Sequence, residues 1–445
     1  MSEAEAAGIA GHGQRSVHTS SIVAKSRDGV KCDRLRLSRD DMAWWCDAKF
    51  GMFIHWGLYA IPAKGEWFMH FSNVPPEEYA RLADEFVPQR FDPHIWVEIA
   101  QAAGMHYMVL TARHHDGFAL WNSPSAHGGF CSTQTAARRD FLAEYVQACH
   151  GANMRVGLYY SPMDWRFPGY FRARELADNA ALMKKQGYGQ VEELMRNYGQ
   201  IDVLWYDGGW LAHQGTDADA AWLWEPVKLN TMVRRYQPKV VISPRSGWEG
   251  DFQCDEGERE IIGPIVGFPW EKCLNLNRPS WGYNETQDLM SRDDVIRTLV
   301  NVVGRGGNVL LNVGPDRDGA IPPAHSERLR EIGAWLERFG KSIYGTRPGP
   351  FQPADGRYCS THRGRSVYVY ALAWNGAQTL RLPPLAVKVT RCSVMAGAPV
   401  SYVQTDEHIE VAVPPACRQS PCTVIELTLE HCIGATGQPP GRSDA

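Results

Sequence analysis

The fold of this chain is best interpreted from one stretch, Ile201-Asp202-Val203-Leu204-Trp205-Tyr206-Asp207-Gly208-Gly209. Its apolar part is typical of a short buried β-strand, and that strand ends on an acid. In folds built on parallel strands, the active site lies beyond the carboxyl ends of the strands. Asp207 is therefore a candidate catalytic residue, although an Asp-Gly pair is also typical of an ordinary turn.

Similar apolar runs recur between about residues 44 and 344 and alternate with amphipathic segments that predict helices. The expected strands are Phe50–Trp56, Tyr107–Arg113, Arg155–Ser161, Ile201–Asp207, Val240–Pro244 and Asn308–Val313, with Cys273–Asn277 as a weaker one. No GxGxxG motif follows the first strand, so we expect a (β/α)-barrel of the TIM type rather than a dinucleotide-binding sheet. The strand count falls one short of eight, which indicates one unrecognised strand or an irregular barrel.

The chain divides into four parts by its composition and its pattern of apolar residues. Residues 1–38 are polar and mixed, and we expect a flexible lead-in there; residues 39–345 carry the barrel pattern. Residues 346–432 contain short alternating runs broken by Gly, Pro and Asn, which predicts a β-sandwich. Residues 433–445 are rich in Gly, Pro and Ser, and we expect a disordered tail.

Composition excludes several classes of partner. The 445 residues carry a net charge of −4, so no nucleic-acid partner is indicated. No apolar run reaches the roughly 18 residues of a membrane helix, so no membrane partner is expected either. The first residues lack a basic region followed by an apolar core, and the 11 cysteines include no CxxC pair. We therefore expect free thiols and a cytoplasmic protein without a metal or cofactor; whether it forms a homo-oligomer is left open.

The chain is unusually rich in tryptophan, with 16 Trp beside 17 Tyr and 15 Phe. Aromatic faces stack on the C–H faces of sugars, so such a composition suits a carbohydrate-binding cleft, although large cores also use Trp.

Polar side chains stand at the carboxyl ends of five of the expected strands. They are His55, His114 with His115, Tyr159, Asp207 and Arg245. Any one of them could be a structural hydrogen-bonding or capping residue, but together they indicate one polar site. Imidazole, guanidinium and indole N–H groups bind sugar hydroxyls, and cleavage of a glycosidic bond needs two carboxyl groups. Asp207, held ionised by Arg245 and the histidines, is the first of these carboxyl groups.

The second carboxyl group should follow the fifth strand. The segment from Glu249 to Glu260 offers several acids, and Glu271 is another. Runs of charge are usually solvated loop faces, so spacing alone does not choose among these acids.

Several long motifs resemble those of the family 29 α-L-fucosidases. They are Phe50-Gly51-Met52-Phe53-Ile54-His55-Trp56-Gly57-Leu58-Tyr59, Gly65-Glu66-Trp67-Phe68, Leu110-Thr111-Ala112-Arg113-His114-His115-Asp116-Gly117-Phe118-Ala119-Leu120-Trp121, Leu204-Trp205-Tyr206-Asp207-Gly208, Trp270-Glu271-Lys272-Cys273, Ser280-Trp281-Gly282-Tyr283-Asn284 and Gly307-Asn308-Val309-Leu310-Leu311-Asn312-Val313-Gly314-Pro315. The likeness spans roughly residues 44 to 345.

This resemblance implies a retaining α-L-fucosidase that acts on fucosylated oligosaccharides or glycoconjugates. Asp207 would be the nucleophile that forms a fucosyl-enzyme ester. The residues implied to bind substrate are His55, Glu66, Trp67, His114, His115, Tyr159, Trp205, Arg245 and Trp281. The aromatic members would also shelter the methyl group of fucose.

The acid/base lies where the sequence departs from the family. Many members carry Gly-Asp-aromatic-x-Thr-Pro-Glu, whereas this chain has Gly250-Asp251-Phe252-Gln253-Cys254-Asp255-Glu256. Glu256 fits the acid/base position best, with Glu258 and Glu271 as alternatives. We expect the neighbouring Asp255 to raise the pKa of Glu256 by like-charge repulsion.

Two other functions compete with this one. A metal-dependent hydrolase could hold zinc with His55, His114, His115 and Asp207, but two adjacent histidines point to opposite sides of a regular strand. A fucose-binding protein without turnover is the second alternative. Within the leading hypothesis, the motifs favour α-1,3/1,4 linkages, and interception of the ester by a sugar would give transfucosylation.

Overall fold

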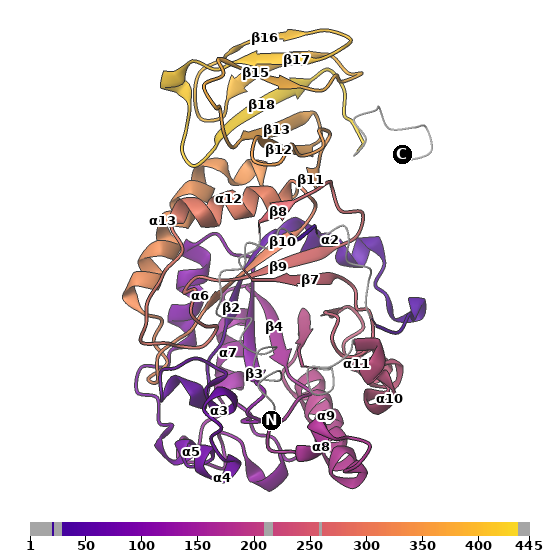
Figure 1. The fold of residues 1–445 in the computed structure, drawn as a ribbon, viewed down its shortest axis with the longest axis vertical. Coiled ribbons are helices and arrows are strands. Elements are labelled where there is room, and N and C mark those ends of the chain that lie inside the picture. Colours follow the sequence, from indigo (N-terminus) through magenta and orange to yellow (C-terminus); the bar gives the residue numbers. More distant parts are fainter. Residues whose placement is uncertain (1–19, 22–28, 209–216, 258–259, 435–445) are drawn as a thin grey trace, which may run out of the picture.

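The computed structural model describes residues 20–21, 29–208, 217–257 and 260–434 (Figure 1). Eight parallel strands form the central sheet. They are β2 (Phe50–Ile54), β3 (Tyr107–Arg113), β4 (Arg155–Tyr160), β5 (Val203–Tyr206), β6 (Val241–Ile242), β7 (Gln253–Glu256), β9 (Trp270–Asn275) and β10 (Asn308–Val313). Their order in the sheet is β6-β5-β4-β3-β2-β10-β9-β7. This curled parallel sheet, followed by antiparallel sheets, confirms the expected fold class.

The eighth strand is β7, which the sequence pattern did not reveal. Its residues, Gln-Cys-Asp-Glu, are polar and read as part of an acidic loop. In the structure β7 pairs with β9 in parallel, with Cys254 opposite Glu271 and Asp255 opposite Lys272. The segment that carries the leading acid/base candidate is thus a barrel strand.

The barrel is irregular between its first and last strands in the sheet order. Among the described residues, no strand pairing joins β6 to β7. Asp251 spans this gap, because its backbone N–H donates to the carbonyl of Ile242 and its side chain accepts from the N–H of Ile242, each at 2.8 Å. Arg234 also donates to the Asp251 carboxylate, at 2.6 Å.

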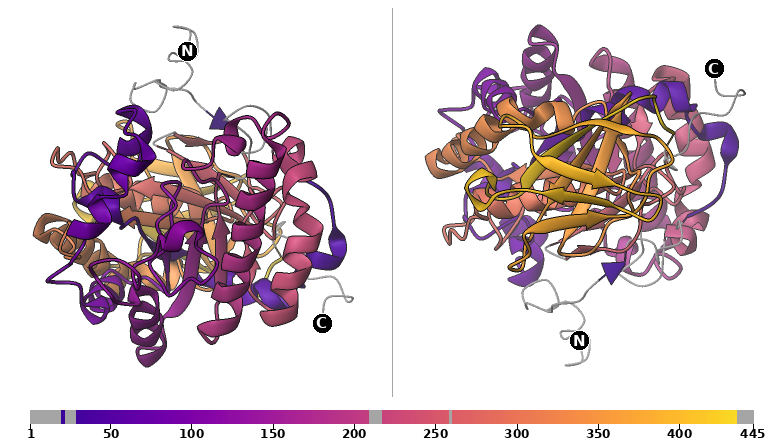
Figure 2. Two further views of the ribbon diagram at one scale, coloured as in Figure 1. Left: turned by 90° about the horizontal axis from the view of Figure 1, so that it is seen from below. Right: turned by 90° about the horizontal axis from the view of Figure 1, so that it is seen from above.

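Helices surround the strands, as the end-on views show (Figure 2). The longer ones are α2 (Arg39–Ala48), α6 (Pro93–Ala102), α7 (Phe141–Gly151), α9 (Ala177–Asn197), α10 (Asp217–Trp224), α11 (Pro226–Tyr236), α12 (Arg292–Val303) and α13 (Pro323–Phe339), and the short ones are α3 (Phe68–Phe71), α4 (Pro76–Tyr79), α5 (Leu82–Glu85) and α8 (Pro168–Phe171). Asp92, Asp140 and Ser291 each accept a backbone N–H at a helix start, as N-cap residues do. None of the described helices is both long and apolar enough to span a bilayer.

The C-terminal part forms two antiparallel sheets beyond α12 and α13 (Figure 1). One sheet contains β11 (Arg347–Pro348), β12 (Tyr358–Arg363), β13 (Ser366–Ala371), β18 (Thr423–Leu429) and β15 (Val389–Val394), and the other contains β14 (Thr379–Leu382), β17 (Ile409–Ala412) and β16 (Ser401–Gln404). Their inner faces share one apolar cluster that includes Val369 and Ile425. The outer face of β12 packs on α12, where the Cys359 thiol donates to the carbonyl of Val300.

Part of the N-terminal segment contacts the barrel. β1 (Ser20–Ser21) pairs in parallel with β8 (Ile261–Ile262). The N–H of Val30 donates to the carbonyl of Gly247 at 2.8 Å, and the N–H of Leu37 donates to the Asp251 side chain at 3.0 Å. Residues 29–37 therefore brace the loop between β6 and β7.

Candidate active site

Asp207 lies directly after β5 and accepts hydrogen bonds from three sides. The Tyr159 hydroxyl donates to Oδ2 at 2.9 Å, Arg245 Nη1 donates to Oδ1 at 2.8 Å, and the backbone N–H of Gly208 donates to Oδ1 at 2.8 Å. His115 Nε2 lies 3.6 Å from Oδ2. These donors fix the orientation of the carboxylate oxygens, as a nucleophile requires.

Arg245 joins the two candidate catalytic carboxyl groups. Its Nη1 donates to Asp207 at 2.8 Å and to Glu256 Oε1 at 2.6 Å. Burial alone would lower the pKa of Arg245, but Glu256 and Asp207 outweigh burial and hold that pKa well above its ordinary value. The backbone of Arg245 has φ of 78°, a conformation that is strained for a side chain other than glycine and that often marks a functional position.

The shared nitrogen limits the distance between the two carboxyl groups. The contacting oxygens of Asp207 and Glu256 can be no farther apart than the sum of their distances to Arg245 Nη1, 2.8 and 2.6 Å. That limit falls within the separation of about 5–5.5 Å typical of retaining glycosidases and below the roughly 6.5–9.5 Å typical of inverting ones.

Asp255 does not face Glu256, which corrects one expectation. Strand alternation places Asp255 on the outer face of β7, where Lys272 Nζ donates to its Oδ2 at 2.5 Å. Both side chains are almost fully buried, with 2% and 0% of their surface exposed. Because the Asp255 charge is paired with Lys272, it gives no basis for the like-charge repulsion that we expected to act on Glu256.

His55 is fixed in one tautomer by Asn312. Its Nδ1 lies 2.7 Å from Asn312 Oδ1, while Asn312 Nδ2 donates to the carbonyl of Trp281 at 2.7 Å and to Asn275 Oδ1 at 3.1 Å. Because both N–H groups of the Asn312 amide already donate to these two oxygens, Asn312 Oδ1 must accept from Nδ1–H of His55. Burial lowers the pKa of His55 to about 4. The imidazole is therefore neutral near pH 7, and its Nε2 is an acceptor.

His114 and His115 lie on the same side of the site, contrary to expectation. β3 ends at Arg113, so both histidines belong to the following loop, and their ring centroids are 4.0 Å apart. His114 stacks on Tyr159 at 5.6 Å, and burial holds its pKa well below the ordinary value. His115 Nδ1 lies 2.7 Å from Ser161 Oγ. Within the described part of the chain, no group of three or more His, Cys, Asp or Glu side chains is arranged to hold a metal ion.

Glu66, Trp67 and Trp281 come from loops at the same end of the barrel. The backbone N–H of Gly282 donates to Glu66 Oε2 at 2.8 Å, and burial raises the pKa of Glu66 to about 7. The ring of Trp281 lies 5.3 Å from that of His55, and Trp67 lies 5.3 Å from His115. These contacts bring Trp281 and Trp67 to the histidines, and Glu66 accepts from the residue that follows Trp281.

Trp205 and Glu271 are both buried and are joined by a hydrogen bond. The Trp205 side chain is 1% exposed, and its Nε1–H donates to Glu271 Oε2 at 3.1 Å, so this N–H is already engaged within the protein. Glu271 is fully buried, and burial raises its pKa to about 7. Glu258, the remaining acid/base alternative, lies outside the described residues.

Sequence reasoning missed two residues that orient the site, Asn312 and Ser161. Asn312 lies within β10, and Ser161 directly follows β4. The available signal was a polar side chain within or directly after an apolar strand, because such a buried group needs a hydrogen-bonding partner.

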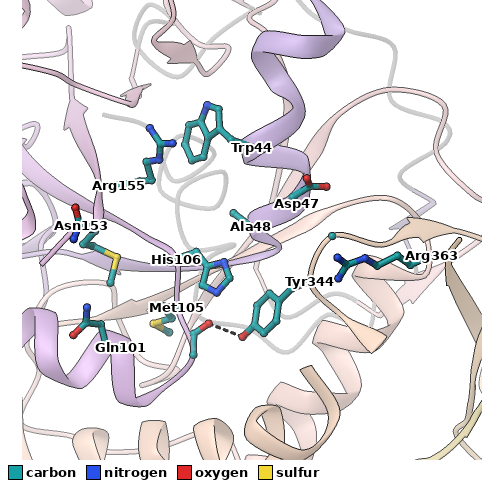
Figure 3. A pocket seen from close by; sticks show the side chains of 13 residues that line it. Trp44, Asp47, Ala48, Gln101, Met105, His106, Asn153, Arg155, Tyr344 and Arg363 are labelled. Carbon is teal, nitrogen blue, oxygen red and sulfur yellow. Dashed lines mark hydrogen bonds between the residues drawn. The ribbon is translucent and has the colours of Figure 1, made fainter. Parts of the chain in front are cut away.

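A separate cavity of about 630 Å³ lies at the opposite end of the barrel (Figure 3). His106 precedes β3 and Arg155 begins β4, so this cavity is at the amino ends of the strands. Two of its polar groups are engaged within the protein, since Arg155 pairs with Asp202 and the Tyr344 hydroxyl donates to the carbonyl of Gly104. Catalytic groups of barrel enzymes lie at the other end.

The fold and the site together define a glycoside hydrolase on a (β/α)-barrel: two carboxyl groups that share one arginine nitrogen stand at the carboxyl ends of parallel strands, among histidines and aromatic rings. Comparison with known proteins then identifies the family. A family model described as Alpha-L-fucosidase matches residues 18–341, and the chain belongs to this family.

Three relatives illustrate the likeness. The human tissue α-L-fucosidase is 32% identical over 441 residues, which cover 90% of each chain. The solved structure of α-L-fucosidase isoenzyme 1 from Paenibacillus thiaminolyticus has a TM-score of 0.76 at 35% identity, covering 88% of this chain and 99% of that one. An α-L-fucosidase of Bacteroides thetaiotaomicron, solved as a trapped covalent intermediate with 2-fluoro-fucosyl fluoride, has a TM-score of 0.79 at 26% identity, covering 93% of this chain and 100% of that one.

Proposed function

We propose that this α-L-fucosidase is a retaining enzyme that removes terminal α-L-fucosyl residues from oligosaccharides or glycoconjugates through a fucosyl-Asp207 ester, with Glu256 as acid/base. The observation that carries the proposal is that Arg245 Nη1 donates to both carboxyl groups, because this keeps their contacting oxygens closer together than the spacing typical of an inverting enzyme. The trapped covalent intermediate of the Bacteroides thetaiotaomicron relative supports the same chemistry.

In the first step, Asp207 attacks the anomeric carbon of the fucosyl residue. The bond from that carbon to the leaving oxygen breaks, and Glu256 transfers its proton to this oxygen. The Tyr159 hydroxyl and Arg245 hold the attacking carboxylate in place.

In the second step, Glu256 removes a proton from water, and the resulting oxygen attacks the anomeric carbon as the ester bond to Asp207 breaks. Esterification has by then removed the charge of Asp207, so Arg245 faces one remaining anion, the carboxylate of Glu256. That is the form of Glu256 that can accept a proton. Two inversions leave the released fucose in the α configuration.

The surrounding side chains suit a deoxy sugar. His55 offers an acceptor at Nε2, and the buried Glu66, His114 and His115 supply further polar atoms for ring hydroxyls. Trp281 and Trp67 add aromatic faces beside them, which favours a ligand with an apolar methyl group. Trp205 contributes to the floor of the site through its ring rather than its engaged N–H.

We extend the proposal to linkage and acceptor. The segment Gly250–Glu256 and the Trp270–Cys273 motif favour α-1,3/1,4-linked fucose, and the ester intermediate also permits transfer to a sugar acceptor instead of water. A hydrolysis screen over fucosyl oligosaccharides of defined linkage tests the first statement, and product analysis at high acceptor concentration tests the second.

The central experiment is proton NMR of aryl α-L-fucoside hydrolysis in the presence of EDTA. We expect turnover to persist and the first-formed fucose to be the α anomer. First-formed β-fucose would contradict the retaining mechanism, loss of turnover with EDTA would favour a metal-dependent hydrolase, and absence of any turnover would favour a fucose-binding protein.

A further inference from the structure

Glu271 is a buried carboxyl group that the proposed reaction does not use. It lies on β9, opposite Cys254 of β7 and Asn308 of β10, and its side chain is fully buried. The hydroxyl of Tyr107 donates to its Oε1 at 2.7 Å, and Nε1–H of Trp205 donates to its Oε2 at 3.1 Å. Both carboxyl oxygens are therefore engaged inside the barrel.

The Trp205 ring supports two residues that hold the nucleophile. Tyr159 stacks on this ring at 5.8 Å with an angle of 14° between the planes, and the Arg245 guanidinium lies over the same ring at 5.3 Å. Tyr159 and Arg245 each donate a hydrogen bond to Asp207. A shift of the indole would thus move two of the donors that orient the Asp207 carboxylate.

The indole itself has two kinds of restraint. Phe53 packs against it at 5.2 Å, which limits its translation without fixing its rotation about the ring normal. The directional restraint is the hydrogen bond to Glu271, which is in turn oriented by Tyr107. A hydrogen bond in a buried environment fixes direction more strongly than apolar packing does.

We propose that Glu271, held by Tyr107, is a positioning residue that fixes the Trp205 ring and through it the donors on Asp207. This inference rests on the proposed role of Asp207. It assigns Glu271 neither contact with the substrate nor proton transfer, because its two oxygens already accept from Tyr107 and Trp205.

Four variants test the proposal. Glu271→Leu removes both acceptors at similar volume, whereas Glu271→Gln can still accept from Trp205 and donate to the Tyr107 oxygen. Tyr107→Phe removes the hydroxyl that orients Glu271. Tyr145→Phe is the matched control, because the Tyr145 hydroxyl is also buried but donates to the carbonyl of Gly157 at 3.3 Å, away from Glu271.

Each variant is assayed with a dinitrophenyl and a phenyl α-L-fucoside, with and without azide, and its thermal midpoint is measured. For Glu271→Leu we expect kcat to fall about 10²-fold with both substrates and KM to change little, as for a misplaced nucleophile. Tyr107→Phe should lose about tenfold in kcat. Glu271→Gln and Tyr145→Phe should stay close to the wild type, and azide should rescue none of them.

Other outcomes overturn the proposal. Loss of activity confined to the phenyl substrate and rescued by azide would make Glu271 an acid/base. A lowered thermal midpoint with an unchanged kcat would make its role structural only. If Glu271→Leu does not fold, the comparison of Tyr107→Phe with Tyr145→Phe decides, and equal kcat values in that pair overturn the proposal. A wild type without fucosidase activity would instead refute the proposed function.

Discussion

Asp255 and Lys272 form a buried ion pair on the outer face of β7 and β9, one residue from the proposed acid/base Glu256. A buried charge without its partner is costly, so Asp255→Ala should lower the free energy of unfolding by about 3–5 kcal/mol. The double variant Asp255→Ala/Lys272→Met removes both charges and should recover a large part of that loss. Urea unfolding of the wild type and the variants measures this, and additive losses in the double variant would contradict the pairing.

Removal of the nucleophile should be rescued chemically. Asp207→Gly should reduce kcat for an aryl α-L-fucoside by on the order of 10³-fold or more, because the ester can no longer form. Azide can enter the space that the carboxylate leaves and attack the same face of the sugar, so it should restore turnover and give β-fucosyl azide. NMR of the product decides: an azide of α configuration, or no rescue, would argue against Asp207 as nucleophile.

The acid/base residue can be identified by comparing substrates whose leaving groups differ in their need for a proton. Glu256→Gln should lower kcat for a phenyl fucoside by about 10²–10⁴-fold, because its leaving oxygen needs a proton, and should affect the first step with a dinitrophenyl fucoside much less. Glu258→Gln, two residues along the chain, is the control and should keep activity on both substrates. The reverse pattern would move the acid/base role to Glu258.

The strands that could be predicted from the sequence are those made of apolar residues, which are buried without needing a partner from another strand. β3 and β10 have the expected bounds because every residue in each is buried, which is what an uninterrupted apolar run indicates. β7 escaped recognition because its Asp255 is buried only by pairing with Lys272, on another strand. A polar strand of this kind cannot be told from a solvated loop by its own pattern.

The same distinction holds in the site. The proximity of side chains at strand ends, such as Asp207 and Arg245, could be predicted from the sequence because the carboxyl ends of parallel strands converge. The role of Asn312 could not, since it depends on His55, 257 residues away in the chain. The opposite directions of His114 and His115 were expected only for a regular strand, and they do not apply because β3 ends at Arg113, directly before both residues.

The tautomer of His55 gives a further prediction. Asn312→Asp places a carboxylate against Nδ1 and should raise the pKa of His55 from about 4 toward neutrality. The protonated ring has a donor at Nε2 where the wild type has an acceptor, so kcat/KM near pH 6 should fall about tenfold and recover partly at higher pH.

NMR titration of the His55 ring reports the pKa of that residue directly. Asn308→Asp is the control, because Asn308 lies at the opposite end of β10, where its amide donates to the carbonyl of Trp45. That variant should lower stability without changing the titration of His55. An unchanged His55 titration in Asn312→Asp would refute the assigned tautomer.

Glu271 should make the stability of the protein depend on pH. Burial raises its folded pKa to about 7 from an ordinary value of 4.5. The folded state therefore binds this proton more tightly than the unfolded state, so the contribution of Glu271 to stability is greatest below pH 4.5 and declines as the pH rises to 7. The decline should amount to about 3 kcal/mol.

Glu271→Gln cannot titrate, so its free energy of unfolding relative to the wild type should rise by about that amount between pH 4 and 8. Urea unfolding of both proteins at constant ionic strength gives this difference, because the other titrating groups, Glu66 among them, are common to both. Parallel curves for the two proteins would mean that Glu271 has the same pKa in the folded and unfolded states, and would contradict the raised pKa.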